Sequence, residues 1–193
     1  MNEAAGLRRG CGSAETYEAL RAAALRLAVA EPSPERRLAP LCDLMWDALS
    51  PSGLSWIGFY LEESEPQDPD APAGAEGGGM VLVARRDKPA CSPIGLHGVC
   101  GQAFLEESVR LVEDVALLGA GYIACDPRDR SELVVPVYRN GARWGVLDAD
   151  SHEQACFGLS DIHGFCSVLR AAGLLGKDLP LRADRLQSTR ESL

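Results

Sequence analysis

The sequence contains no long uncharged run of apolar residues and no excess of positive charge. Without such a run no helix can cross a bilayer, and residues 1–13 lack the apolar segment of a secretory signal. The 19 Lys and Arg residues against 28 Asp and Glu leave a net charge of −9, so no basic field is available to bind nucleic acid or an anionic membrane. We therefore expect a cytoplasmic protein that binds neither.

The chain of 193 residues is long enough for one domain with a full hydrophobic core. Its 46% hydrophobic and 24% charged residues are typical of a folded globular protein. We expect an N-terminal tail over residues 1–13, a folded domain over 14–176, and a charged, frayed C-terminal tail over 177–193. In the cytoplasm the seven cysteines are expected to be core, metal-binding or redox thiols rather than a disulfide framework.

Local sequence signals predict two helices near the start of the chain and one near its end. Ser13 can cap a helix that runs to about Val29, and the Ser-Pro pair at 33–34 is typical of the start of a second helix. Pro40 lies inside the apolar pattern of that second helix, so we expect the helix to kink or to begin late. Ser160 can cap the last helix.

The chain between these helices has the patterns of a β-sheet. Residues 55–61 have the aromatic and β-branched content of a strand, with Trp56 and Tyr60 on one face; plain core packing would also explain these two aromatics. Residues 64–79 are acidic and rich in Pro and Gly, which indicates a flexible, dispensable surface loop. The element order predicts an α+β fold, in which an antiparallel sheet carries the terminal helices on one face and a lid of loops and a helix on the other.

Three cysteines lie outside the apolar stripes. Cys91 and Cys125 are expected in loops, and Cys100 near a helix start, where unpaired amides and the helix dipole lower a thiol pKa. Arg128 and Arg130 follow Cys125 closely enough to favour its thiolate. A cysteine before a strand is more often a small core residue, so this pattern indicates a reactive thiol without establishing one.

Three carboxylates lie on the two strands of a predicted hairpin around Asn140-Gly141. A three-residue loop with a left-handed glycine would place Glu132 directly opposite Asp148, with Asp150 next on the same face. A two-residue loop would put Glu132 and Asp148 on opposite faces. We expect the first register. Like charges that close repel each other, so the three carboxylates indicate a bound cation or a shared proton.

Six segments between about Tyr17 and Leu174 carry a resemblance to a known family. They are Trp56-Ile57-Gly58-Phe59-Tyr60, Lys88-Pro89-Ala90-Cys91, Gly98-Val99-Cys100-Gly101, Ile123-Ala124-Cys125-Asp126, Ser131-Glu132 and Gly145-Val146-Leu147-Asp148-Ala149-Asp150-Ser151. Jointly they resemble the free methionine-(R)-sulfoxide reductases, which are small single-domain GAF proteins. The stretch from Cys91 to Cys100 is shorter than in that family, so the reach from Cys91 to Cys125 stays open. Tyr122 also stands where the family usually has His.

The resemblance implies a GAF-like fold and an L-methionine (R)-S-oxide reductase that acts on free methionine sulfoxide, with thioredoxin as the external reductant and with no cofactor or metal. It implies that Cys125 attacks the sulfoxide sulfur and becomes a sulfenic acid. Cys91 would then condense with it to a disulfide. Cys100 resembles an auxiliary thiol, and whether Cys91 or Cys100 resolves the sulfenic acid stays open.

The resemblance also implies roles for the carboxylates and aromatics. Asp148 is assigned the proton for the leaving sulfoxide oxygen, and Glu132 and Asp150 are assigned the substrate ammonium. Trp56 and Tyr60 would form the apolar wall around the methyl-sulfur end. The residues agree independently, because a zwitterionic amino acid needs an anionic pocket for its ammonium and an oxygen that leaves sulfur must be protonated.

Two other hypotheses compete with this one. The first is a non-catalytic GAF sensor that binds a small molecule or uses its cysteines as a redox switch. The second is a zinc site formed by Cys91, His97, Cys100 and Cys125, whose N and S ligands suit zinc but whose spacing lacks the paired short knuckles of such sites. A homodimer is compatible with the sequence as well.

Overall fold

The computed structural model describes residues 10–63, 79–121 and 125–184. Within these ranges one sheet has the strand order β3-β2-β1-β6-β5-β4-β7. The helices are α1 (Ala14–Ala30), α2 (Pro34–Leu49), α3 (Val99–Glu106) and α4 (Leu159–Ala171), and the strands are β1 (Trp56–Glu62), β2 (Gly79–Arg86), β3 (Ile94–Gly95), β4 (Val109–Val112), β5 (Ser131–Arg139), β6 (Ala142–Ser151) and β7 (Leu181–Asp184). No helix in the described ranges is both long and apolar enough to span a bilayer.

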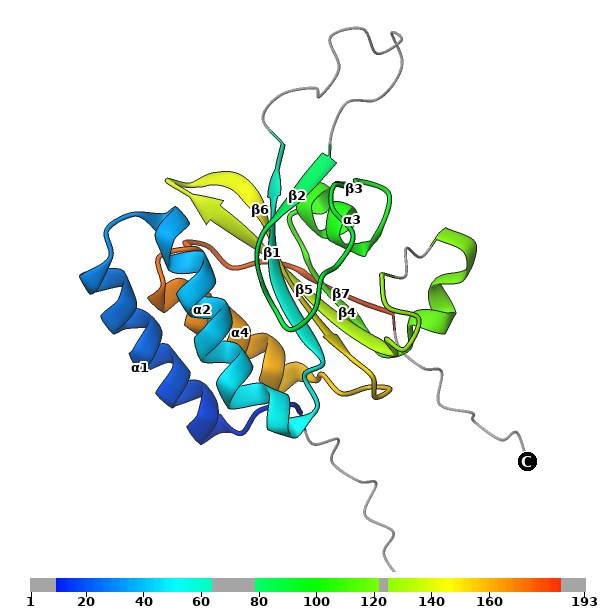
Figure 1. Cartoon of the computed structure of the whole chain (residues 1–193), viewed down its shortest axis with the longest axis horizontal. Helices are drawn as coiled ribbons and strands as arrows, with labels where there is room; N and C mark the ends of the chain where they lie inside the picture. The colour runs from blue at the N-terminus through cyan, green and yellow to red at the C-terminus, as the bar shows by residue number, and fades with distance from the viewer. Residues whose placement is uncertain (1–9, 64–78, 122–124, 185–193) are drawn as a thin grey trace, which may run out of the picture.

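The sheet separates two unequal layers, as predicted. Figure 1 shows α1, α2 and α4 gathered on one side of the sheet, with α3 and its neighbouring loops on the other. Two distinct clusters of buried residues fill the two sides. All strand pairs are antiparallel except β4 with β7. The α+β prediction is confirmed.

Helix α1 begins where its capping signal predicts, whereas α4 begins at Leu159 with Gly158 as its N-cap, so the prediction of a cap at Ser160 was wrong. The Ser13 hydroxyl accepts a hydrogen bond from the Thr16 amide at 3.1 Å, which satisfies one of the free donors at the start of α1. Helix α2 begins at Pro34 and continues through Pro40, so the expectation of a late start was wrong. Pro40 is exposed, and a carbonyl left without its helical donor there can be hydrated instead.

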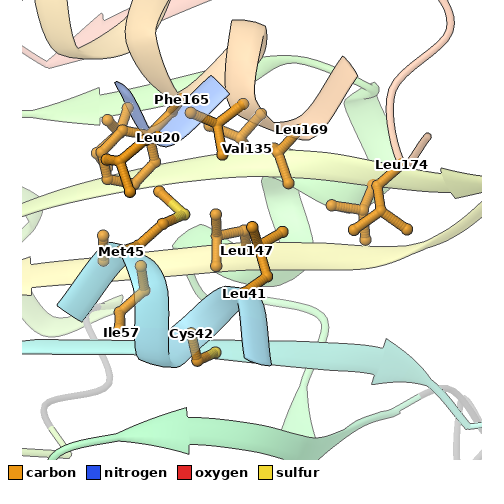
Figure 2. Packing of buried hydrophobic residues seen from close by; sticks show 14 of the residues in the cluster. Leu20, Leu41, Cys42, Met45, Ile57, Val135, Leu147, Phe165, Leu169 and Leu174 are labelled. Atoms are coloured by element: carbon orange, nitrogen blue, oxygen red, sulfur yellow. The ribbon is translucent and has the colours of Figure 1, made fainter. Parts of the chain in front are cut away.

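The larger core lies between the three helices and the sheet. Figure 2 shows Leu41 and Met45 of α2 facing Leu147 of β6, with Phe165 and Leu169 of α4 beside them. All five side chains have no solvent exposure, so truncation of Met45 to Ala should cost about 2–5 kcal/mol. This rigid layer fixes the strands whose opposite face carries the candidate site.

The β5–β6 hairpin has a register that the sequence did not predict. Next to the turn Arg139 pairs with Ala142, as a two-residue loop requires, but beyond Val137 the register shifts by one residue. This shift leaves Trp144 without a partner and forms a β-bulge. Glu132 therefore lies opposite Asp150, not Asp148. The predicted register was wrong, yet the bulge restores the alternation that places all three carboxylates on one face.

The C-terminal segment is more ordered than the charged sequence suggests. Residues Leu181–Asp184 form β7, parallel to β4, and the Val109 amide donates to the Pro180 carbonyl at 2.8 Å. The prediction of a frayed tail was therefore wrong for these four residues, because backbone pairing with an open sheet edge needs no apolar pattern. Residues 1–9, the acidic segment 64–78 and residues 185–193 lie outside the described ranges.

Candidate functional site

The face of the sheet opposite the three long helices carries the predicted site residues. Trp56 in β1 pairs with Asp150 in β6, and Gly58 pairs with Asp148. Glu132 in β5 pairs with the same Asp150 from the other side. Because directly paired residues point to the same face, the pairing brings the aromatics and all three carboxylates together.

A cavity of about 50 Å³ lies over this face. It has room for a few water molecules or a ligand group of similar size. Its lining includes residues from the sheet, from the start of α3 and from the loops that precede α3 and β5. These are Trp56, Tyr60, Ala90, Ile94, Gly95, Gly98, Val99, Cys100, Cys125, Asp129, Glu132, Asp148 and Asp150. Except for Cys91, every residue that the sequence predicts for the site lines this cavity.

The two aromatics hold the loop that carries Cys91. The indole Nε1 of Trp56 donates to the Lys88 carbonyl at 2.9 Å, and the Tyr60 hydroxyl donates to the Cys91 carbonyl at 2.8 Å. The Lys88 ammonium forms an ion pair of 2.7 Å with Asp126, which follows Cys125 directly. Both aromatics line the cavity, and their polar tips hold the loop of Cys91, which Lys88 links to the residue after Cys125.

The Cys91 and Cys125 thiols lie within hydrogen-bonding reach of each other. Both residues are exposed. Partial burial and the Cys91 thiol raise the pKa of Cys125 to about 12. Arg128 and Arg130 pair with aspartates instead, so the predicted stabilisation of the Cys125 thiolate by these arginines was wrong.

Cys100 lies in the first turn of α3, as predicted, but it is buried beneath the cavity. Burial raises the pKa of its thiol well above the ordinary range, and the negative charges of Asp148 and Glu132 raise it further. The thiol also forms a hydrogen bond with Asp148, and a neutral thiol is the donor in such a bond. The predicted lowering of its pKa by the helix start was wrong, because desolvation and neighbouring anions outweigh the helix dipole.

Glu132 and Asp148 are buried and Asp150 is half-buried. Within the described residues Arg110 and Lys88 lower the pKa values of Glu132 and Asp150 only in part. Burial raises the pKa of Asp148 to about 7. Burial and the charge of Asp148 raise the pKa values of Glu132 and Asp150 well above their ordinary range. Oε2 of Glu132 and Oδ1 of Asp148 have no hydrogen-bond partner in the described protein. Buried acceptors of this kind are costly, so the pocket is built to receive hydrogen-bond donors that carry positive charge.

Comparison with models of known protein families finds no match. The chain is 35% identical to the free methionine-R-sulfoxide reductase of Escherichia coli over 116 residues. This alignment covers 59% of this chain and 60% of that protein. A crystal structure from Burkholderia vietnamiensis, described as a putative GAF sensor protein, shows 34% identity and a TM-score of 0.68 over 82% of this chain and 92% of that one. The free methionine-R-sulfoxide reductase of Neisseria meningitidis, solved with its substrate, shows 27% identity and a TM-score of 0.69 over 85% and 91% of the two chains.

This chain belongs to the GAF-domain proteins, and it is similar to the free methionine-R-sulfoxide reductases among them. The matched part spans 53% to 65% of the length of three curated relatives. The stretch from Cys91 to Cys100 is shorter than in the reductase pattern, yet the Cys91 thiol still lies within reach of the Cys125 thiol. Tyr122, which departs from that pattern, lies outside the described residues.

Sequence reasoning missed one titratable residue that lines the pocket. Asp129 lines the cavity, is 5% exposed, and has an Oδ1 atom with no hydrogen-bond partner in the described protein. Nε2 of His152 lies 3.6 Å from that atom and 3.3 Å from Oδ2 of Asp126. The available signal was an aspartate between two arginines in the Cys125 loop, but that pattern does not indicate burial.

The zinc hypothesis based on Cys91, His97, Cys100 and Cys125 is not supported by the geometry. Within the described ranges, groups able to ligate a metal converge at two places, and neither includes Cys91, His97 or Cys125. Cys100 is buried, whereas Cys91 and Cys125 are exposed. The two exposed thiols contact each other instead of a shared metal-binding group.

Proposed function

We propose that this protein reduces free L-methionine-(R)-sulfoxide to methionine and is recycled by thioredoxin. The observation that carries this proposal is one pocket with two complementary ends. Cys125, in contact with Cys91, lies at its mouth, and buried carboxylates with unpartnered oxygens form its floor. Similarity to the free methionine-R-sulfoxide reductases supports the same function.

The floor of the pocket suits the ammonium of a free amino acid. Glu132 and Asp150 would hold the ammonium, and one of its donors would satisfy Oε2 of Glu132, which has no hydrogen-bond partner in the described protein. The positive charge would also lower the raised pKa values of these carboxyl groups and favour their ionised forms. A methionine sulfoxide inside a peptide has no such ammonium, so the pocket is expected to select the free amino acid.

The first chemical step transfers oxygen from substrate to enzyme. Cys125 attacks the sulfoxide, the S–O bond of the substrate breaks, and the products are methionine and a cysteine sulfenic acid. Asp148, whose pKa of about 7 lets it hold a proton near neutrality, would protonate the oxygen as it leaves the substrate sulfur. The substrate gains two electrons, which Cys125 loses.

The second step closes a disulfide. The Cys91 sulfur attacks the sulfur of the sulfenic acid and expels the oxygen as water. We assign resolution to Cys91 because it contacts Cys125, whereas the buried Cys100 thiol is engaged with Asp148. Both sulfurs of the resulting disulfide belong to exposed residues, so thioredoxin can reach them and return both thiols.

The test is thioredoxin-coupled reduction of free methionine-(R)-sulfoxide by metal-free, fully reduced protein. The S epimer and a blocked peptide form serve as substrate controls, and Cys125→Ser as the enzyme control. We expect turnover of the free R epimer alone, and its loss in Cys125→Ser. Absence of turnover by the wild-type protein would refute the proposal and leave a GAF sensor that binds a small molecule.

A further inference from the structure

We propose that the reduced pocket also binds one zinc ion through Cys100, Glu132 and Asp148. One ligand atom from each of these residues lies within 4.8 Å of the other two. All three residues are buried, and they come from three different elements, α3, β5 and β6. A sulfur and two carboxylate oxygens that converge at this spacing form three corners of a zinc site.

The unpartnered oxygens indicate that the site is built for a ligand. Glu132 and Asp148 are 5% and 7% exposed, and each has one carboxylate oxygen without a hydrogen-bond partner in the described protein. Both residues line the cavity. A cation between the two carboxylates would replace their mutual repulsion by attraction.

The donor set favours zinc over other common divalent ions. Zinc accepts cysteine sulfur and carboxylate oxygen in a tetrahedral arrangement, and three protein ligands leave one position open. Magnesium and calcium prefer oxygen ligands alone and take more of them. The thiol of Cys100 therefore selects a softer ion.

The second convergent group, Asp126, Asp129 and His152, is a weaker candidate. Asp126 is already paired with the Lys88 ammonium at 2.7 Å and with the Arg128 guanidinium at 2.9 Å. Two protein cations therefore neutralise that cluster. Among the described residues, no Lys or Arg forms a salt bridge with Glu132 or Asp148.

Zinc binding at the first group requires no redox chemistry. The Cys100 thiol loses its proton to solvent as the zinc–sulfur bond forms, and no electron is transferred. If the proposed function holds, the ion takes up Glu132, which would hold the substrate ammonium, and Asp148, which would supply the proton. Zinc then competes with methionine sulfoxide and is not a cofactor of the reaction.

The experiment uses the full chain with Cys91→Ser and Cys125→Ser, which removes the two exposed thiols that could bind zinc by themselves. The reduced protein is titrated with zinc against a chromophoric chelator without oxygen. We expect one zinc ion per chain. Adding Cys100→Ser or Glu132→Gln should weaken binding by more than about 100-fold, beyond the loss typical of an outer-shell partner. Cys166→Ser, which alters a half-buried thiol outside the cavity, should leave the affinity unchanged.

A spectroscopic readout separates direct ligation from a general loss of folding. Cobalt in place of zinc should show thiolate-to-metal charge-transfer absorption that disappears in Cys100→Ser, while circular dichroism keeps its folded signature. Absence of bound zinc, or full affinity and charge transfer in Cys100→Ser, would overturn the inference. Because turnover is measured on metal-free protein and zinc binding without substrate, failure of one proposal can be distinguished from failure of the other.

Discussion

Replacement of Asp148 by Asn should stabilise the protein near neutral pH while it impairs the reaction. The ordinary pKa of this carboxyl is 3.8, and burial raises it to about 7 in the folded protein. The folded state therefore binds the proton more tightly than the unfolded chain. The stabilising contribution of this proton is complete below the unfolded pKa and is lost as the pH rises through the folded value.

The magnitude follows from the distance between the two pKa values. About three pH units correspond to about 4 kcal/mol of folding free energy. The wild-type protein should lose up to about this much stability through Asp148 between about pH 4 and about pH 7. An amide at this position has no proton to lose and can still accept a hydrogen bond from Cys100. The negative charge of Asp148 raises the pKa of Asp150. The neutral amide in Asp148→Asn would remove this effect, so the pKa of Asp150 should fall in the variant.

The assay is urea unfolding followed by tryptophan fluorescence at several pH values between about 5 and about 8. We expect Asp148→Asn to show a flatter pH profile than wild type, and turnover reduced by about 100-fold or more if Asp148 supplies the proton. Asp47→Asn, at an exposed position on α2, is the matched control and should follow wild type. Parallel pH profiles for wild type and Asp148→Asn would refute the reasoning.

Three further changes test the loops around the pocket. Cys91→Ser should release one methionine per chain in a single turnover and then stop, as measured by amino-acid analysis; sustained thioredoxin-linked turnover would show that another thiol resolves Cys125. Lys88→Met breaks the ion pair with Asp126 and should lower the equilibrium constant for disulfide formation against glutathione. The decrease should be roughly two- to fivefold, because a partly exposed ion pair contributes little. The control Arg86→Met, which breaks a surface ion pair, should leave this constant unchanged. Replacing residues 64–78 by Asn-Gly should leave turnover intact and change the free energy of unfolding by less than about 1 kcal/mol; lost turnover would assign that segment a role.

The sequence predicted the elements whose signals are local. The cap at Ser13 and the proline at position 34 each mark a helix start through contacts within one turn. The shared face of Glu132, Asp148 and Asp150 was also predicted, but through the wrong pairing. The bulge in β6 depends on how that strand meets its neighbours, and turn sequence alone does not encode it.

Protonation states were the least predictable part of the site. Helix starts and nearby arginines lower thiol pKa values in general, and both signals are present here. Burial acts against them for Cys100 and for Cys125, and burial emerges only when distant segments meet. For the same reason Asp129, which resembles a solvated loop residue, was not predicted to reach the cavity.

The short strand β7 has a consequence for the behaviour of the protein in solution. An unpaired sheet edge offers free N–H and C=O groups on which strands of other molecules can add, which leads to aggregation. Here β7 covers the edge of β4, and it presents in its place a strand of only four residues that includes the exposed Arg182. Short, charged edge strands resist such addition. A shortened chain that ends before Leu181 would keep the whole pocket yet expose β4, so the last described residues protect solubility, not catalysis.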